Sequence, residues 1–329
     1  MADMAEDHGY LCSFIEAPED RKFVDSLYPK VQQVLRKLSL VESAKAGSYS
    51  AMRTLRSFAA AFKISMGDVS VSVDPEEGSG DSGILEFDLP DLFERIGLAA
   101  KAAGKGWILL IDEVQYLSKV ELSALIVAIH HSNQKNLPIL FLGAGLPQVA
   151  ALSGDAKSYA ERLFDYPPVG PLDDVFAEIA IRGPVSSENE AIEDDAVREI
   201  IHRTEGYPFF LQEWGYQAWN IACHSPIKKQ DILDATPLAL NRLDDSFFRV
   251  RFDRLTPKQR EYVFAMASLG KGPYRSSDVA ESMGKEMQKL GTFRKDIIQK
   301  GMIYSPAYGD IAFTVPMFED FLNRLKQRG

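Results

Sequence analysis

The sequence predicts an α/β domain with a parallel sheet, followed by a bundle of helices and a final module of three helices and a two-stranded wing. Three observations support this fold class. Two apolar runs, Trp107–Ile111 and Pro138–Leu142, flank one helical segment, Pro and Gly separate several helical segments after residue 170, and a hairpin pattern follows the last helices. A strand, a helix and a second strand at this spacing are typical of a parallel βαβ unit.

Composition indicates a globular protein without an export signal. The chain has 329 residues, of which 46% are apolar and 26% charged, so a folded chain of about two or three domains is expected. The first eight residues are acidic and lack the basic and apolar segments of a secretory signal. The only cysteines, Cys12 and Cys223, lack metal-ligand spacing, and we expect two small buried hydrophobes in a reducing cytoplasm.

Charge is distributed unevenly. The net charge is -10, yet residues 251–329 hold 14 Lys and Arg against 9 Asp and Glu. Any contact with nucleic acid is therefore expected from this last part of the chain. A solvated basic face is the alternative.

The first part of the chain divides into predicted elements. A helix that ends at Gly9 precedes a strand over 10–15, and two paired helices follow over 21–38 and 43–62. Alternating apolar residues from Ile64 to Val73 indicate a β-hairpin, and residues 74–83 a loop. A helix is then expected from about Pro90 to Ala103, before the first buried strand.

Helix-start signals define the remaining elements. Ser118 and Glu121 have the spacing of a capping box for a helix that reaches about Gln134, before the second buried strand. Helices are then expected near 172–182, 194–204, 208–222 and 229–242. Thr256 and Gln259 form a second capping box, with helices near 257–268, 277–283 and 287–300 and a hairpin over 302–305 and 311–315. The latter pattern predicts a winged helix-turn-helix.

Two adjacent acids give the clearest chemical signal. Asp112 and Glu113 follow the first buried strand, at the edge where open parallel sheets bind ligands. In phosphoryl chemistry the first acid holds Mg2+, usually through water, and the second polarises an attacking water, as in a Walker B motif with a catalytic glutamate. The alternative is that Asp112 and Glu113 only cap the end of the strand or face water there. A phosphate-cradling loop, G-x-x-x-x-G-K-[ST], does not occur in the sequence.

Four blocks, in order, resemble a bacterial AAA+/STAND-type ATPase whose nucleotide domain is similar to that of origin-recognition proteins. The blocks are Asp112–Leu117, Gly143–Pro147, Lys157–Phe164 and Gly206–Glu213. The resemblance implies a P-loop NTPase-type sheet that lacks its first strand and phosphate loop, since in that family both precede the segment similar to 7–16. It also implies a helical lid and a C-terminal winged helix.

The same resemblance assigns roles. Asp112 would hold Mg2+, Glu113 would be the hydrolytic base, and Arg162 would complete the γ-phosphate site. Gly206, Tyr207 and Pro208 would touch the nucleotide from the lid. The alternative for Arg162 is an exposed arginine paired with an acid. The alternative for the Gly206–Pro208 turn is an ordinary helix-capping turn. The strand before Gly143 ends without the polar sensor residue that many AAA+ proteins carry there, which favours slow, switch-like turnover.

The helix near 287–300 is the candidate recognition helix. Its candidate DNA-contacting residues are Lys289, Thr292, Arg294, Lys295, Gln299 and Lys300. Docking on protein is the alternative. Phe247, Phe248, Phe252 and Tyr262 are expected in the core.

The sequence therefore predicts three domains: a partial ATPase domain over 1–170, a helical lid over 171–246 and a winged helix over 247–329. Together they predict a cytoplasmic switch that uses ATP and Mg2+, binds ATP poorly in this form, and contacts duplex DNA or a protein, with a homo-oligomer as one arrangement. The other hypothesis is a non-catalytic DNA-binding or scaffold protein on a degenerate ATPase fold.

Overall fold

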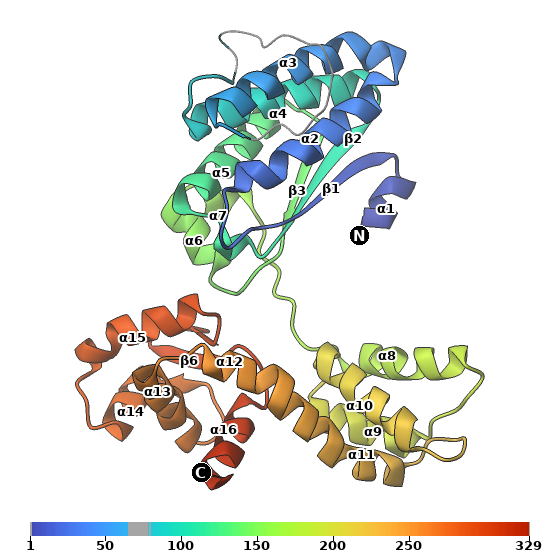
Figure 1. Ribbon diagram of the computed structural model, residues 1–329, viewed down its shortest axis with the longest axis vertical. Coiled ribbons are helices and arrows are strands. Elements are labelled where there is room, and N and C mark those ends of the chain that lie inside the picture. Colours follow the sequence, from blue (N-terminus) through green and yellow to red (C-terminus); the bar gives the residue numbers. More distant parts are fainter. Residues whose placement is uncertain (1, 65–77, 79, 329) are drawn as a thin grey trace. The chain divides into compact units, whose positions relative to one another are not determined.

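A computed structural model describes residues 2–64, 78 and 80–328 (Figure 1). The chain forms two compact units, residues 1–167 and 168–329, and each is described by itself. The predicted hairpin after Ile64 and half of the predicted loop that follows it lie outside the described residues.

A parallel sheet of three strands forms the centre of the first unit. Its strands are β1 (Tyr10–Glu16), β2 (Gly106–Asp112) and β3 (Ile139–Gly143), with β2 in the middle. Tyr10 pairs with Gly106, and Trp107 pairs with Ile139, both in parallel register. The predicted parallel α/β sheet is therefore confirmed.

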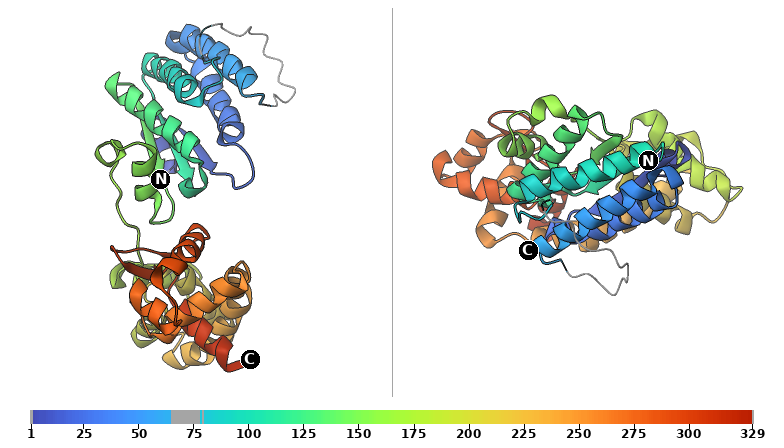
Figure 2. Two further views of the ribbon diagram at one scale, coloured as in Figure 1. Left: turned by 90° about the vertical axis from the view of Figure 1, so that its left-hand side faces the viewer. Right: turned by 90° about the horizontal axis from the view of Figure 1, so that it is seen from above.

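Helices α2, α3, α4 and α5 pack side by side in chain order (Figures 1 and 2). The helices of this unit are α1 (Ala2–Asp7), α2 (Phe23–Ser39), α3 (Lys45–Ala61), α4 (Leu85–Ala102), α5 (Lys119–Gln134), α6 (Val149–Ala156) and α7 (Ala160–Leu163). Trp107, Leu109 and Ile111 alternate along β2 and belong to the same hydrophobic cluster as these helices. The indole of Trp107 also donates a hydrogen bond of 3.0 Å to Ser13 Oγ.

The second predicted strand is not fully buried. Leu140 is 47% exposed, and on the same face of the sheet Phe14 of β1 is 54% exposed. The expectation of a buried strand over 138–142 is wrong in this respect, because β3 lies at an edge of the described sheet with β2 on one side only.

Local signals explain where two helices begin. The predicted capping box is present: Ser118 accepts from the Glu121 amide, and Glu121 accepts from the Ser118 amide. Helix α4 begins at Leu85, five residues before the predicted start at Pro90, and includes this proline. The buried carboxylate of Asp88 accepts hydrogen bonds from the backbone amides of Ser82 and Gly83 and so fixes the turn that precedes α4.

The second unit is mostly helical. Its helices are α8 (Asp174–Ser187), α9 (Asp194–Thr204), α10 (Pro208–Ile221), α11 (Lys229–Arg242), α12 (Arg249–Asp253), α13 (Pro257–Ser268), α14 (Ser276–Ser282), α15 (Met287–Gln299) and α16 (Phe318–Arg328). A π-helical turn, Leu243–Phe248, joins α11 to α12. The predicted helix over 229–242 therefore continues into further helical turns.

A small antiparallel sheet accompanies the last helices. Its strands are β4 (Tyr274–Arg275), β5 (Ile303–Tyr304) and β6 (Asp310–Phe313), in the order β4-β6-β5. The β5–β6 hairpin follows α13, α14 and α15 as predicted, and the Thr256–Gln259 capping box starts α13. Strand β4 and helix α16 were not predicted.

One hydrophobic cluster extends through the second unit. Phe248, Phe252 and Tyr262 are buried and Phe247 is half-buried, so their predicted place in the core is confirmed. The expectation for the cysteines is wrong, because Cys223 is exposed in the loop after α10 and Cys12 is only half-buried. In the described part of the chain, the helices are too short or too polar to cross a membrane.

Candidate functional site

The carboxyl ends of the neighbouring strands β1 and β2 bring acidic residues together. Asp112 ends β2, and Glu16, the last residue of β1, is its partner in register. Asp112 and Glu113 are half-buried, whereas Glu16 is exposed. Parallel sheets bind ligands at this edge, and the predicted position of Asp112 and Glu113 at the carboxyl end of a parallel strand is confirmed.

Glu113 adopts an unusual backbone conformation. Its φ and ψ angles are 55° and 39°, in the left-handed region that side chains other than glycine rarely adopt. This turn lets the Glu113 amide donate a hydrogen bond of 2.8 Å to Asp112 Oδ1. Such conformations persist where the surrounding structure fixes them, and they concentrate at functional sites.

Gln115 holds the glutamate to the loop after β3. Its side-chain amide donates a hydrogen bond to Glu113 Oε2, and its Oε1 accepts one of 3.1 Å from the Leu146 amide. Sequence reasoning missed Gln115, although the residue lies inside the quoted Asp112–Leu117 block. Its polar side chain, two residues beyond the proposed base, is the signal that could have identified it.

The glycines after β3 allow this loop to approach closely. A Cβ atom on Gly145 would lie 2.5 Å from Gln115 Oε1, and one on Gly143 would lie 3.0 Å from Val114 Cγ2. Backbone bonds reinforce the contact, from Ala144 N to Ile111 O and from Val114 N to Ala144 O. The Gly-Ala-Gly segment, which lacks a polar sensor, thus provides room for the Gln115 side chain.

The donor set fits Mg2+ held through water. Asp112 Oδ1 accepts from a backbone amide, while Oδ2 has no hydrogen-bond partner among the described residues. Mg2+ commonly keeps several waters and takes only one or two protein carboxylates. The donor set does not supply a phosphate cradle, because a shallow pocket beside Asp112 has an otherwise apolar lining: Phe14, Leu110, Ile111, Leu142, Gly143 and Ala144.

Arg162 lies on the short helix α7, whose first residue, Ala160, is buried in the core. The Arg162 side chain is exposed. In the described part of the chain, no acid forms an ion pair with it and no hydrogen bond joins it to Asp112 or Glu113. Its role in completing a γ-phosphate site stays a prediction.

The Gly206–Pro208 turn belongs to the second unit and links α9 to α10. Gly206 has a φ of +72°, and a Cβ there would lie 2.2 Å from the Leu172 carbonyl oxygen, so this position requires glycine. Tyr207 precedes α10, and Pro208 is its first residue. The geometry is that of a helix-capping turn packed on Leu172, and contact with a nucleotide stays a prediction.

The candidate DNA-contacting residues of α15 separate into two groups. Arg294 donates to Ser276 Oγ, and Lys300, just beyond the helix, donates to Arg254 O and to Gln259 Oε1. Lys300 is exposed nonetheless, as are the candidates for which the described residues show no hydrogen bond to another helix: Lys289, Thr292, Lys295 and Gln299. Tyr308, fully exposed between β5 and β6, was not singled out as a contact residue from the sequence, although it lies in the predicted turn of the hairpin.

Comparisons with known proteins give one family match. No curated protein matches the sequence. A family model described as a domain of unknown function (DUF8462) matches residues 245–322. This segment includes α13, α14, α15 and the β5–β6 hairpin.

Solved structures define the fold. A Walker-type ATPase of Pyrococcus abyssi shares 15% sequence identity and superposes with a TM-score of 0.52, over 98% of this chain and 93% of that one. The RuvB Holliday junction branch migration motor of Thermotoga maritima (18% identity, 90% and 94% covered) and the ORC1 protein of Aeropyrum pernix in complex with DNA (13%, 97% and 79%) each give a TM-score of 0.39. These last two similarities are too distant to support a conclusion. The first establishes that the chain has the α/β fold of a Walker-type ATPase, as predicted.

Proposed function

We propose that the protein is an ATP-binding switch of the AAA+/STAND type. The observation that carries the proposal is the Asp112–Glu113 pair at the end of the central parallel strand, with Gln115 bonded to the glutamate. Asp112 would hold Mg2+ through water, and Glu113 would accept a proton from the water that attacks ATP. Bound Mg2+ would neutralise charge on the phosphates.

The proposed nucleotide site includes four further residues, Arg162, Gly206, Tyr207 and Pro208. A guanidinium offsets negative charge on a transferring phosphoryl group, and the exposed Arg162 side chain is free to do so. The lid turn would report the presence of the nucleotide. The same proposal places the switch in the cytoplasm, with a homo-oligomer as one arrangement.

The chain as printed is expected to bind ATP weakly. A triphosphate needs backbone amides and a lysine around its phosphates, and the sequence has no phosphate-loop match. The apolar pocket beside Asp112 offers no basic side chain in their place. Weak binding and slow turnover are therefore part of the proposal.

The C-terminal module would transmit the state of the site. Its helices α13, α14 and α15 and the β5–β6 hairpin have the order of a winged helix, and Lys289, Thr292 and Lys295 are exposed on α15. These side chains fit contacts with duplex DNA. Arg294 and Lys300 would act indirectly, by holding the module together.

The apolar lining beside Asp112 favours a second candidate function. A non-catalytic DNA-binding or scaffold protein would retain the sheet and lose the chemistry of its edge. The two candidates differ in whether the chain hydrolyses ATP with Glu113 as the base.

Measuring phosphate release at saturating MgATP tests the proposal. Glu113→Gln should abolish turnover while ATP still binds, because the amide cannot accept the proton. Glu16→Gln, at the neighbouring strand end, is the matched control and should keep the wild-type rate. Equal rates in both variants, or no turnover in the wild type, would favour the non-catalytic scaffold.

A further inference from the structure

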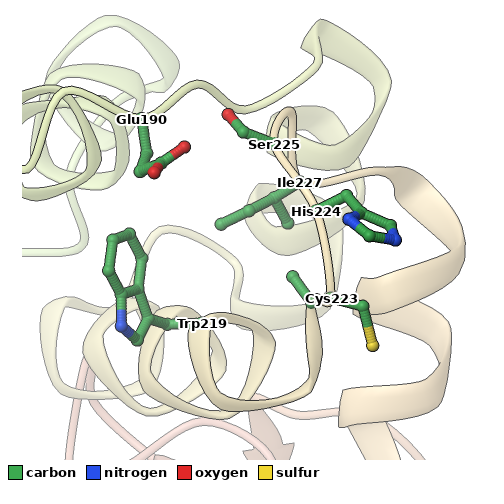
Figure 3. A pocket seen from close by; sticks show the side chains of 7 residues that line it. Glu190, Trp219, Cys223, His224, Ser225 and Ile227 are labelled. Carbon is green, nitrogen blue, oxygen red and sulfur yellow. The ribbon is translucent and has the colours of Figure 1, made fainter.

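A pocket in the second unit lies between the α8–α9 loop, the end of α10 and the α10–α11 loop (Figure 3). Glu190 and Trp219 border the same space, and Ile227 points into it, whereas the side chains of His224 and Cys223 turn away. Ile227 is buried, Glu190 is exposed and Trp219 is 43% exposed. The pocket therefore combines an apolar floor, an indole and a carboxylate.

Trp219 differs from the other two tryptophans. Trp107 and Trp214 are buried, and their indole nitrogens donate hydrogen bonds to Ser13 and Thr236. In the described residues, Trp219 has no hydrogen bond, ring contact or cation over its ring. The exposed face of the Trp219 ring is therefore available to a ligand in the pocket.

Glu190 is likewise without a partner. In the part of the chain that the structure describes, no lysine or arginine forms an ion pair with its carboxylate. The nearby Arg182 instead pairs with Glu178 and Asp194. A cation in the pocket would gain both this charge and the face of the Trp219 ring.

The two loops that frame the pocket are fixed to one another. Ile227 N donates to Ala191 O over 2.8 Å, Glu193 N donates to Ile227 O over 2.9 Å, and Ala191 N donates to Ser225 Oγ over 3.1 Å. The Glu190 amide bonds to Val185 O at the end of α8. The walls are thus held in place before any ligand arrives, which lowers the entropic cost of binding.

Surrounding charge also favours a cation. Helix α10 ends at Ile221, and the carbonyl end of a helix carries partial negative charge. Five of the eight residues 188–195 are acidic and none is basic, and among the described ion pairs only that of Asp194 with Arg182 involves one of these acids. Such a concentration of negative charge attracts a basic segment of a protein more strongly than a single small amine.

We propose that this pocket binds a lysine or arginine side chain of a partner protein, with the aliphatic stem on Ile227 and the charged end between Trp219 and Glu190. The pocket lies at the end of α10 opposite to the Gly206–Pro208 turn. It is therefore a second binding site, independent of the proposed nucleotide site.

The test is an NMR titration of the full chain that follows the Trp219 indole N–H signal, which Trp219→Phe identifies by its loss. The probe is the tripeptide Gly-Lys-Gly blocked at both ends, and its neutral analogue carries norleucine in place of lysine. We expect a saturable shift with the lysine peptide alone. The Trp214 indole signal, from a buried ring of the same unit, should stay in place and reports that the unit remains folded.

Variants separate charge from general effects. Glu190→Gln should weaken lysine-peptide binding by about three- to fivefold, and Glu188→Gln, an exposed acid of the same loop, should leave it unchanged. Equal binding of the norleucine peptide, equal effects of the two variants, or the absence of saturation would overturn the proposal. Butylammonium that binds as tightly as the peptide would overturn the assignment to a partner protein.

Discussion

The side chain of Gln115 joins the Glu113 carboxylate to the backbone amide of Leu146. Through this one side chain, the glutamate that follows β2 is fixed by the loop that follows β3. A general base must keep a defined position relative to its water. Gln115 is thus a positioning residue in the proposed site.

Gly145→Ala tests this arrangement. The added methyl group would lie 2.5 Å from Gln115 Oε1 and 2.8 Å from Val149 Cγ2, so the Gln115 side chain has to leave the position in which it accepts from the Leu146 amide. We expect a loss of about 2 kcal/mol in the stability of the first unit. Hydrogen exchange at the β2 amides measures this change.

The control is Gly154→Ala in α6. A Cβ at this position meets only Glu161 Oε1, at 3.7 Å, and alanine favours the helix by about 0.5–1 kcal/mol over glycine. This variant should be slightly more stable than the wild type. A destabilisation equal to that of Gly145→Ala would mean that the close contact with Gln115 is unimportant.

Glu319 predicts a pH dependence of the second unit. Burial at the start of α16 raises the pKa of Glu319 above its ordinary value. The folded state therefore holds the proton more tightly than the unfolded state, so the contribution of Glu319 to stability is greatest at low pH and is lost as the pH rises through the folded pKa.

Glu319→Gln removes this penalty. The variant should exceed the wild type in free energy of unfolding at about pH 7, and the difference should shrink at about pH 3, where both states of the wild type hold the proton. Urea denaturation at the two pH values measures the difference. Glu281→Gln, at an exposed position of α14, is the control. A stability difference between Glu319→Gln and the wild type that is the same at both pH values would contradict the prediction.

Lys295 tests the proposed contact with DNA. If the exposed face of α15 binds phosphates, affinity for a mixed-sequence duplex should fall steeply with salt, and Lys295→Gln should lower the slope of log affinity against log salt by about 0.9. Lys326→Gln on α16 should leave the slope unchanged. Fluorescence anisotropy at several salt concentrations measures it, and a flat response of the wild type would remove DNA as a partner of this face.

Elements with strong local signals were predicted well. Three elements of the first unit were predicted from features that act over a few residues. These features are the glycine after α1, the continuous apolar residues of β2 and the capping box of α5. The start of α4 depends instead on the buried Asp88 carboxylate and its bonds to Ser82 and Gly83. No periodicity of apolar residues reveals such an interaction.

Two other elements were missed for different reasons. Strand β4 has only two residues and exists because it pairs with β6. Helix α16 did have a signal, since the apolar residues Phe318, Phe321, Leu322 and Leu325 have helical spacing.

The position of the two acids in the proposed site was predicted from the sequence, whereas the residues that support them were not. The position of Asp112 and Glu113 can be predicted from the apolar strand that precedes them. The importance of Gln115 depends instead on its contacts with Glu113 and with Leu146, and Leu146 lies 31 residues further along the chain. Arg294 and Lys300 are basic residues in a helical pattern, and only tertiary contacts with Ser276, Arg254 and Gln259 distinguish them from Lys295.

Titration of the chain with MgATP, followed by the NMR signals of the Glu113 and Leu146 amides, tests the central claim most directly. We expect saturable shifts with a dissociation constant on the order of 1 mM in the wild type and in Glu16→Gln. Asp112→Asn keeps an oxygen that can accept from the Glu113 amide but loses the charge, and it should abolish the shifts. The absence of saturation in the wild type, or unchanged binding in Asp112→Asn, would contradict the claim that this edge of the sheet is a Mg2+-nucleotide site.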